Sequence, residues 1–106
     1  MPQYLWQRQK EGMAGYLIFY YVLEEGEIAR IATAHSVRRQ GAASQMFRKL
    51  LDFCREHKIT RIMLEVRENN EVARQFYGKC GFTKDGIRRN YYENPKENAV
   101  LMSVNL

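Results

Sequence analysis

Two apolar, aromatic-rich runs open the chain, at residues 4–9 and 14–23, with the turn signal Lys10-Glu11-Gly12 between them. Both runs are rich in residues that favour extended backbone, so the pattern predicts a β-hairpin. A second turn signal, Glu24-Glu25-Gly26, separates the hairpin from a third β-prone run at residues 27–34. The first third of the chain is therefore predicted to be an antiparallel meander.

The spacing of apolar residues changes to a helical period after Gly41. Over residues 42–56 the apolar positions form a single stripe on an α-helix, with polar residues opposite. His57 and Lys58 suit the negative end of a helix dipole, so the helix is predicted to end there. The stripe consists of Ala43, Met46, Phe47, Leu50, Leu51 and Cys54.

A buried strand is predicted at residues 61–66, where apolar and polar side chains alternate. Ile62, Leu64 and Val66 share one face of this strand, whereas Glu65 and Arg67 lie on the other. The alternation matters for function because it places a carboxylate among apolar neighbours in the middle of a sheet.

A second helix is predicted next, because Asn69 or Asn70 can cap its first turn. Gly81 is placed to end it in a left-handed conformation. Two further strands are predicted at residues 82–85 and 99–104, joined by a polar loop that holds residues 88–92 and Asn94-Pro95. The inner stripe of the helix is predicted to be Val72, Ala73 and Phe76.

The predicted order of elements is β-β-β-α-β-α-β-β. It indicates an α+β fold with a mixed, mainly antiparallel sheet and a central βαβ unit, parallel only across that crossover. A length of 106 residues suits one domain, so residues 1–106 are predicted to form a single domain.

Composition narrows the class of protein. A hydrophobic content of 45% with 12% aromatic residues favours a folded globule. No apolar run approaches the roughly 20 residues that span a bilayer, and the first residues lack a signal-peptide pattern, so we expect a cytoplasmic protein without a membrane partner. The net charge of +5 favours anionic partners: nucleic acid, a phosphorylated cofactor or an acidic substrate.

The cysteines and histidines do not indicate a metal site. Cys54 and Cys80 lack metal-ligand spacing and are too few for a disulfide framework, so they are predicted to be free thiols. His35 and His57 are isolated in the sequence and are predicted to lie at the surface.

The junction before the first helix is a candidate anion site. Glycine and alanines keep side chains away from the unpaired N–H groups of a helix start, and two arginines add positive charge. The alternative is an ordinary tight turn. The junction is neither a Walker loop nor a dinucleotide fingerprint, since it lacks Gly-Lys-Ser/Thr and has too few glycines. It reads Arg38-Arg39-Gln40-Gly41-Ala42-Ala43-Ser44.

Glu65 and Tyr77 are the candidates for proton transfer. A carboxylate in the middle of a strand must be paired, hydrated or functional. Glu65 therefore either acts as a base or forms an ion pair with Arg67 or a neighbouring strand. Tyr77 either serves as an acid or packs in the core with its hydroxyl bonded to the backbone.

Taken in order, these motifs resemble the GNAT N-acetyltransferases. The segment Arg38-Arg39-Gln40-Gly41-Ala42-Ala43 is similar to the acetyl-CoA signature of that family, and the likeness extends from about Met13 to Leu106. The order of the motifs along the chain is similar to that of the RimI-type branch, the ribosomal-protein-alanine N-acetyltransferases. That series reads Leu64-Glu65-Val66-Arg67, Phe76-Tyr77, Gly81-Phe82 and Arg88-Arg89-Asn90-Tyr91-Tyr92.

The resemblance implies a binding role for three segments. The backbone of a strand end would bind the acetyl and pantetheine part of acetyl-CoA, the anion junction would wrap the pyrophosphate, and Asn70 would contact the pantetheine arm. The strand end is Ile31, Ala32 and Thr33, and the junction is Arg38, Arg39, Gln40, Gly41, Ala42, Ala43 and Ser44.

The resemblance also implies catalytic roles. Glu65 would be the general base, acting through water on the acceptor ammonium, and Tyr77 would be the acid that protonates the departing thiolate. Arg88, Tyr91 and Tyr92 would belong to a loop over the acceptor; the alternative is an ordinary exposed loop. No metal is required.

The chain departs from the family pattern at its start. GNAT domains begin with a strand and two helices, which this sequence lacks, so it is either a fragment or a minimal version. Thr33-Ala34-His35-Ser36 also replaces the usual end of the strand, Val-x-Pro. We expect an uncovered aromatic surface and a homodimer that shields it. The surface would include Tyr4, Trp6, Tyr16, Ile18 or Tyr20.

The leading functional hypothesis is acetyl transfer from acetyl-CoA to the N-terminal α-amine of a protein or peptide. The alternatives are acetylation of a small-molecule amine and a non-catalytic module that binds acetyl-CoA or a partner protein. A nucleic-acid partner is disfavoured because no RNA- or DNA-binding motif is present.

Overall fold

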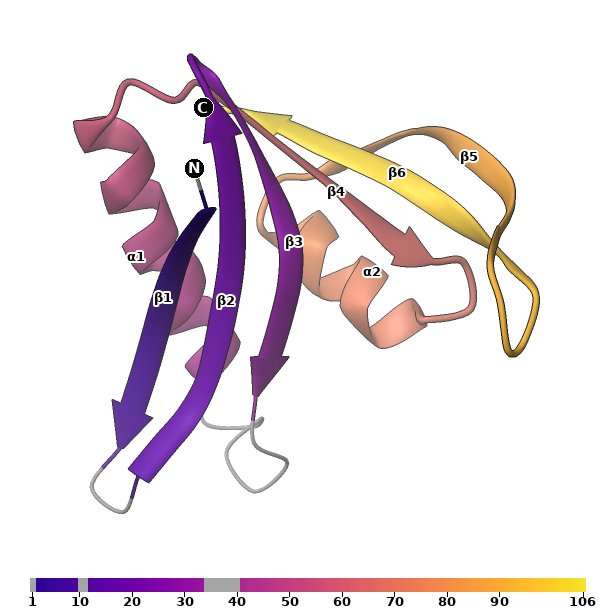
Figure 1. Ribbon diagram of the computed structural model, residues 1–106, viewed down its shortest axis with the longest axis horizontal. Coiled ribbons are helices and arrows are strands. Elements are labelled where there is room, and N and C mark those ends of the chain that lie inside the picture. Colours follow the sequence, from indigo (N-terminus) through magenta and orange to yellow (C-terminus); the bar gives the residue numbers. More distant parts are fainter. Residues whose placement is uncertain (1, 10–11, 34–40) are drawn as a thin grey trace. The chain divides into compact units, whose positions relative to one another are not determined.

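The computed structural model describes residues 2–9, 12–33 and 41–106, and it has two compact units, Met1–Thr60 and Arg61–Leu106 (Figure 1). The order of helices and strands is the predicted one, and the α+β class is confirmed. Within each unit the strand pairs are antiparallel.

The first unit is a three-stranded meander with one helix. Strands β1 (Pro2–Gln9), β2 (Gly12–Val22) and β3 (Glu25–Thr33) pair in sequence, which confirms the predicted hairpin and meander. Helix α1 (Ala42–Glu56) has the predicted bounds and packs along the strands (Figure 1). The turn Lys10-Glu11 lies outside the described residues.

The core of this unit lies between β2 and α1. Leu17 and Phe19 of β2 and Met46 and Leu50 of α1 are fully buried. Phe53 meets Phe19 edge to face, with 6.3 Å between the ring centroids. Because side chains alternate along a strand, Tyr16, Ile18 and Tyr20 lie on the opposite face of β2.

Gly26 lies inside β3, although the sequence pattern predicted a turn residue. The turn consists of Leu23 and Glu24, with Leu23 at φ 55°, and Val22 pairs with Glu25. A Cβ at position 26 would overlap the ring of Phe19. The glycine is therefore required by close packing of the strand against an aromatic ring and not by the turn.

The second unit is a three-stranded sheet with one helix. Strand β6 (Glu97–Asn105) lies between β4 (Arg61–Arg67) and β5 (Thr83–Tyr92), and helix α2 (Glu71–Lys79) follows β4. The predicted alternation of β4 is confirmed, because Ile62, Leu64 and Val66 are buried. The register places Leu64 beside Met102, and Met102 lines a depression with Glu71, Arg74 and Gln75, so α2 packs on this face.

Helix α2 begins and ends as predicted. The side chain of Asn70 accepts a hydrogen bond from Ala73 N at 3.2 Å, and Gly81 has φ 98° just beyond the end of the helix. One prediction was wrong: Val72 is 81% exposed and is not part of the inner stripe. The helix turns Tyr77 inward instead, and it contacts Phe82.

The prediction of a loop at residues 88–92 was also wrong, because these residues form the second half of β5. Two register irregularities, between Lys84 and Gly86 and between Arg88 and Tyr92, let this polar segment follow β6. Asn90 takes φ 53° and its N–H donates to Asn98 Oδ1 at 2.9 Å. Pairing with β6 outweighs the low strand propensity of the segment.

The two cysteines and His57 are in the states predicted for them. Cys54 and Cys80 are free thiols, and Cys54 is buried. His57 is exposed and stacks on Phe53 with 4.0 Å between ring centroids, whereas His35 lies outside the described residues. Among the residues the structure describes, no helix is long and apolar enough to cross a membrane.

Candidate active site

Glu65 lies at the centre of β4, on the face opposite α2. The register pairs it with Leu101 of β6, and Leu101 in turn faces Gly86 of β5. Its side chain is 20% exposed, and Glu65 Oε1 lies 3.6 Å from Arg88 Nη2. The ion pair anticipated as the structural alternative therefore exists, but its partner is Arg88, which reaches across β6.

Tyr77 is held on the inner side of α2 by two aromatic neighbours. Only 6% of Tyr77 is exposed, and its ring meets those of Phe76 and Phe82 edge to face, with 5.6 Å between centroids in each case. Burial raises the pKa of Tyr77 to about 12, with smaller contributions from Cys80 and Tyr92. The phenol is therefore protonated at neutral pH and can donate its proton.

Tyr91 and Tyr92 form an aromatic pair at the end of β5. Their rings meet edge to face with 5.1 Å between centroids. Arg67 lies over the ring of Tyr92 at 4.3 Å, and Arg88 lies over the ring of Tyr91 at 4.9 Å. Tyr91 is 45% exposed, so the pair presents an aromatic surface to solvent while two guanidinium groups fix its position.

Tyr92 links the two candidate catalytic residues electrostatically. Its pKa is raised first by partial burial and then by the negative charge of Glu65 and by Tyr91 and Glu97, against the opposing charge of Arg67. Tyr92 also contributes to the raised pKa of Tyr77. Glu65 and Tyr77 themselves belong to a strand and a helix, on different faces of the sheet.

The start of α1 has the geometry expected of an anion site. Gly41 takes φ 78° at the helix N-terminus, a Cβ there would meet nothing within 4 Å, and no side chain caps the helix. The first-turn N–H groups, at Ala42, Ala43 and Ser44, have no intrahelical acceptors. This fits a pyrophosphate, because N–H groups and the helix dipole both favour negative charge. Arg38, Arg39 and Gln40 lie outside the described residues.

The other predicted binding residues lie at the ends of elements. Ile31, Ala32 and Thr33 close β3, where they pair with Leu17, Tyr16 and Gly15. Asn70 uses its side-chain oxygen to cap α2, and its amide nitrogen carries two further donors. Among the described residues, no group of three or more histidine, cysteine or acidic side chains could hold a metal ion.

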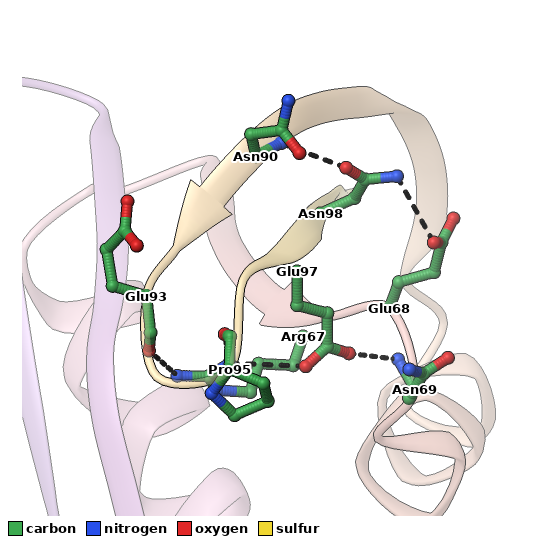
Figure 2. Close-up of polar contacts among 8 residues, drawn as sticks. All are labelled: Arg67, Glu68, Asn69, Asn90, Glu93, Pro95, Glu97 and Asn98. Carbon is green, nitrogen blue, oxygen red and sulfur yellow. Dashed lines mark hydrogen bonds and ion pairs between the residues drawn. The ribbon is translucent and has the colours of Figure 1, made fainter.

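Sequence reasoning missed a polar network around Arg67, which Figure 2 shows. Arg67 contacts Glu97 at 3.2 Å, and Glu97 also accepts from the backbone N–H of Asn69 at 2.6 Å. The only sequence signal was an arginine directly after a buried strand. Its partner lies 30 residues away, so the pairing could be recognised only once β4 and β6 were aligned.

The chain is similar to acetyltransferases of known sequence and known structure. Residues 2–82 match the acetyltransferase (GNAT) family. A ribosomal protein bS18-alanine N-acetyltransferase of Haemophilus ducreyi is 30% identical over 101 residues, which cover 92% of this chain and 70% of that protein. The crystal structure of the ribosomal-protein-S18-alanine N-acetyltransferase from Escherichia coli superposes with a TM-score of 0.84 at 32% identity, over 92% of this chain and 64% of that chain.

A third match concerns the fold alone. The structure of a GNAT family acetyltransferase from Elizabethkingia anophelis, solved with acetyl-CoA bound, superposes with a TM-score of 0.82 at 21% identity. The superposition covers 93% of this chain and 72% of that chain. The chain spans 66% and 70% of the length of two of the curated relatives it matches, which is about two thirds.

Proposed function

Because the chain belongs to the acetyltransferase (GNAT) family, we propose that it transfers the acetyl group of acetyl-CoA to a primary amine, the N-terminal α-amine of a protein or peptide. The observation that carries the proposal is that Arg88 lies 3.6 Å from the carboxylate of Glu65 and 4.9 Å from the ring centroid of Tyr91, so that a carboxylate in the middle of a strand lies close to an exposed aromatic pair. Relatives at 30–37% identity that act on ribosomal protein bS18 support a protein N-terminus as the acceptor.

Glu65 serves the acceptor in this proposal. An amine enters as ammonium and becomes a nucleophile only after losing a proton, which Glu65 takes through a water molecule. The guanidinium of Arg88, whose Nη2 lies 3.6 Å from Glu65 Oε1, holds the carboxylate in place on this face of the sheet. Tyr91 and Tyr92 flank the first residues of the peptide, and Arg88 fixes the ring of Tyr91.

Tyr77 serves the donor. The amine nitrogen forms a bond to the acetyl carbon while the bond from that carbon to the CoA sulfur breaks, and the phenol of Tyr77 supplies a proton to the departing thiolate. Acetyl-CoA supplies the activated acyl group. Its pyrophosphate would be held by Arg38, Arg39, Gln40, Gly41, Ala42, Ala43 and Ser44, its acetyl and pantetheine part by Ile31, Ala32 and Thr33, and its pantetheine arm also by Asn70.

One assay tests the proposed function and separates it from its alternatives. CoA release from acetyl-CoA is measured with N-terminal peptides, including one that copies the start of bS18, and with small amines. We expect turnover with peptides and little with small amines. Turnover confined to small amines would reassign the acceptor class. Acetyl-CoA binding in calorimetry without any turnover would instead identify a binding module.

We also propose that the chain forms a homodimer through the outer face of β2. Tyr20 is 45% exposed there, while Tyr16 and Ile18 on the same face are half-buried. Contiguous aromatic residues on an exposed face favour a protein partner. The side chains of Tyr4 and Trp6, also expected there, lie outside the described set. Sedimentation should show a dimer that Tyr20→Lys converts to monomer; a wild-type monomer at all concentrations contradicts the proposal.

A further inference from the structure

We propose that Arg67 is a positioning residue for acetyl transfer, holding Tyr92 and the tip of the β5–β6 hairpin in the geometry that receives a peptide acceptor. The peptide acceptor in this proposal comes from the proposed function, whereas the contacts of Arg67 do not depend on that function. Arg67 is the last residue of β4, and the strand register carries its side chain toward the start of β6.

The guanidinium of Arg67 holds the hairpin tip by three hydrogen bonds. Nη2 donates to the carbonyl of Glu93 at 3.3 Å, and Nη1 donates to the carbonyl of Pro95 at 3.3 Å and to Glu97 Oε1 at 3.2 Å. The plane of the same group lies over Tyr92, 4.3 Å from the ring centroid. One side chain thus fixes both the turn, whose contacts Figure 2 shows, and the aromatic ring that precedes it.

Glu97 connects this clamp to the helix that carries Tyr77. Its carboxylate is 10% exposed and uses both oxygens, Oε1 for Arg67 and Oε2 for the backbone N–H of Asn69. The N–H of Asn70 then donates to the carbonyl of Arg67 at 3.0 Å, and Asn70 caps α2. The position of the hairpin and the start of α2 are therefore set by one buried carboxylate.

A second link runs in parallel through Asn98. Its side chain donates to Glu68 Oε1 at 3.3 Å and accepts from the N–H of Asn90 at 2.9 Å, and its carbonyl accepts from the N–H of Glu68 at 3.0 Å. Asn90 directly precedes Tyr91. The loop after β4 thus contacts β6 at Glu97 and Asn98, and Asn98 in turn holds the residue that precedes the aromatic pair. Arg67 adds the contact with a ring of that pair.

The chemistry of these contacts requires arginine. Two separate nitrogens donate to three oxygens while the carbon of the guanidinium lies over an aromatic ring, which a planar fork can do and an ammonium cannot. Lysine at position 67 would keep the charge and lose the geometry. If Arg67 contributed charge alone, Arg67→Lys would behave as the wild type.

The test compares Arg67→Lys and Arg67→Ala with wild type in kcat and KM for a peptide acceptor, a small amine and acetyl-CoA. We expect kcat/KM for the peptide to fall roughly 10- to 100-fold in both variants, mainly through KM, because the acceptor surface loses its position. The Kd of acetyl-CoA and the rate with a small amine should change by no more than about twofold.

Arg61→Ala is the matched control. Arg61 lies on the same strand, its side chain is 37% exposed against 36% for Arg67, and it also pairs with an acidic residue, Asp85 at 3.8 Å. Arg61 also donates to Ser103 Oγ at 3.3 Å, and it lies at the opposite end of β4 from Arg67. Equal losses in the Arg61 and Arg67 variants, or equal losses with peptide and small amine, would show a structural effect only and overturn the inference.

Amide hydrogen exchange gives a readout that does not need turnover. Arg67→Ala should speed exchange at the amides of Asn69, Lys96 and Glu97, whereas Arg61→Ala should not. Unchanged exchange there refutes the clamp even if the wild type is inactive. A wild type without turnover, combined with faster exchange in Arg67→Ala, would instead refute the proposed function and retain the clamp.

Discussion

Replacing Glu65 with glutamine should lower kcat roughly 100- to 10,000-fold, the contribution expected of a general base. The change keeps the shape of the side chain and removes its negative charge and its ability to take a proton. The Kd of acetyl-CoA should stay close to that of the wild type. CoA release under saturating acetyl-CoA and peptide measures the first quantity, and calorimetry measures the second.

The pH dependence makes this prediction specific. A peptide α-amine has a pKa of about 7.7–8.0, so it loses its proton to solvent as the pH rises. The defect of Glu65→Gln should therefore shrink above pH 8, because the enzyme no longer has to remove that proton. A defect of constant size from pH 6.5 to 9.5 would mean that Glu65 positions the acceptor and does not act as a base.

A matched control excludes lost stability as the cause. Glu65→Gln removes an ion pair with Arg88, which is 53% exposed, and such pairs contribute about 0–1 kcal/mol. Asp85→Asn removes a comparable pair, with Arg61 at 3.8 Å, from the same unit. It should unfold at nearly the temperature of Glu65→Gln while retaining activity. Tyr77→Phe should also lower kcat, because the phenol proton is lost while the aromatic packing remains.

Replacing Gly26 with alanine should destabilise the protein by about 1–3 kcal/mol, the usual cost of overpacking a core. The added Cβ overlaps the ring of Phe19, which is fully buried and packs edge to face against Phe53 of α1. A loss of 1 kcal/mol corresponds to about 4–8 °C in Tm for a domain of roughly this size. Thermal unfolding followed by circular dichroism measures it.

Two further variants identify the cause of that loss. Gly86→Ala is the control, since Gly86 lies in β5 and a Cβ there meets nothing within 4 Å. Phe19→Leu shortens the obstructing ring, so the double variant with Gly26→Ala should lose less stability than the sum of the two single changes. Additive losses would place the strain elsewhere than at the contact between residues 19 and 26.

Local patterns were sufficient for the helices and for β4. The helical stripe predicted α1 with its observed bounds, and Asn70 and Gly81 marked the ends of α2, because periodicity and capping depend only on nearby residues. The same logic failed at Val72, which carries an apolar side chain on the solvent side of α2. It also failed at Gly26, where glycine is needed because the ring of Phe19, seven residues earlier, occupies the space of a Cβ.

The candidate site divides in the same way. Its chemical groups, the carboxylate of Glu65, the phenol of Tyr77 and the pair Tyr91-Tyr92, could be named from the sequence because their residue types limit what they can do. Their partners could not be named. Arg88 reaches Glu65 across β6, and Arg67 meets Glu97 and Tyr92 only because β4 and β6 pair in one particular register.

The sequence by itself therefore determined the order of elements, the family and the groups capable of proton transfer, all of which follow from residue type and short-range spacing. The tertiary structure decided that residues 88–92 form a strand, that Arg88 is the counter-ion of Glu65, and that Arg67 clamps the hairpin. The physical reason is that the pairing of β4 with β6, and the ion pairs of Glu65 and Arg67, join residues more than 20 positions apart, and no local pattern encodes their register.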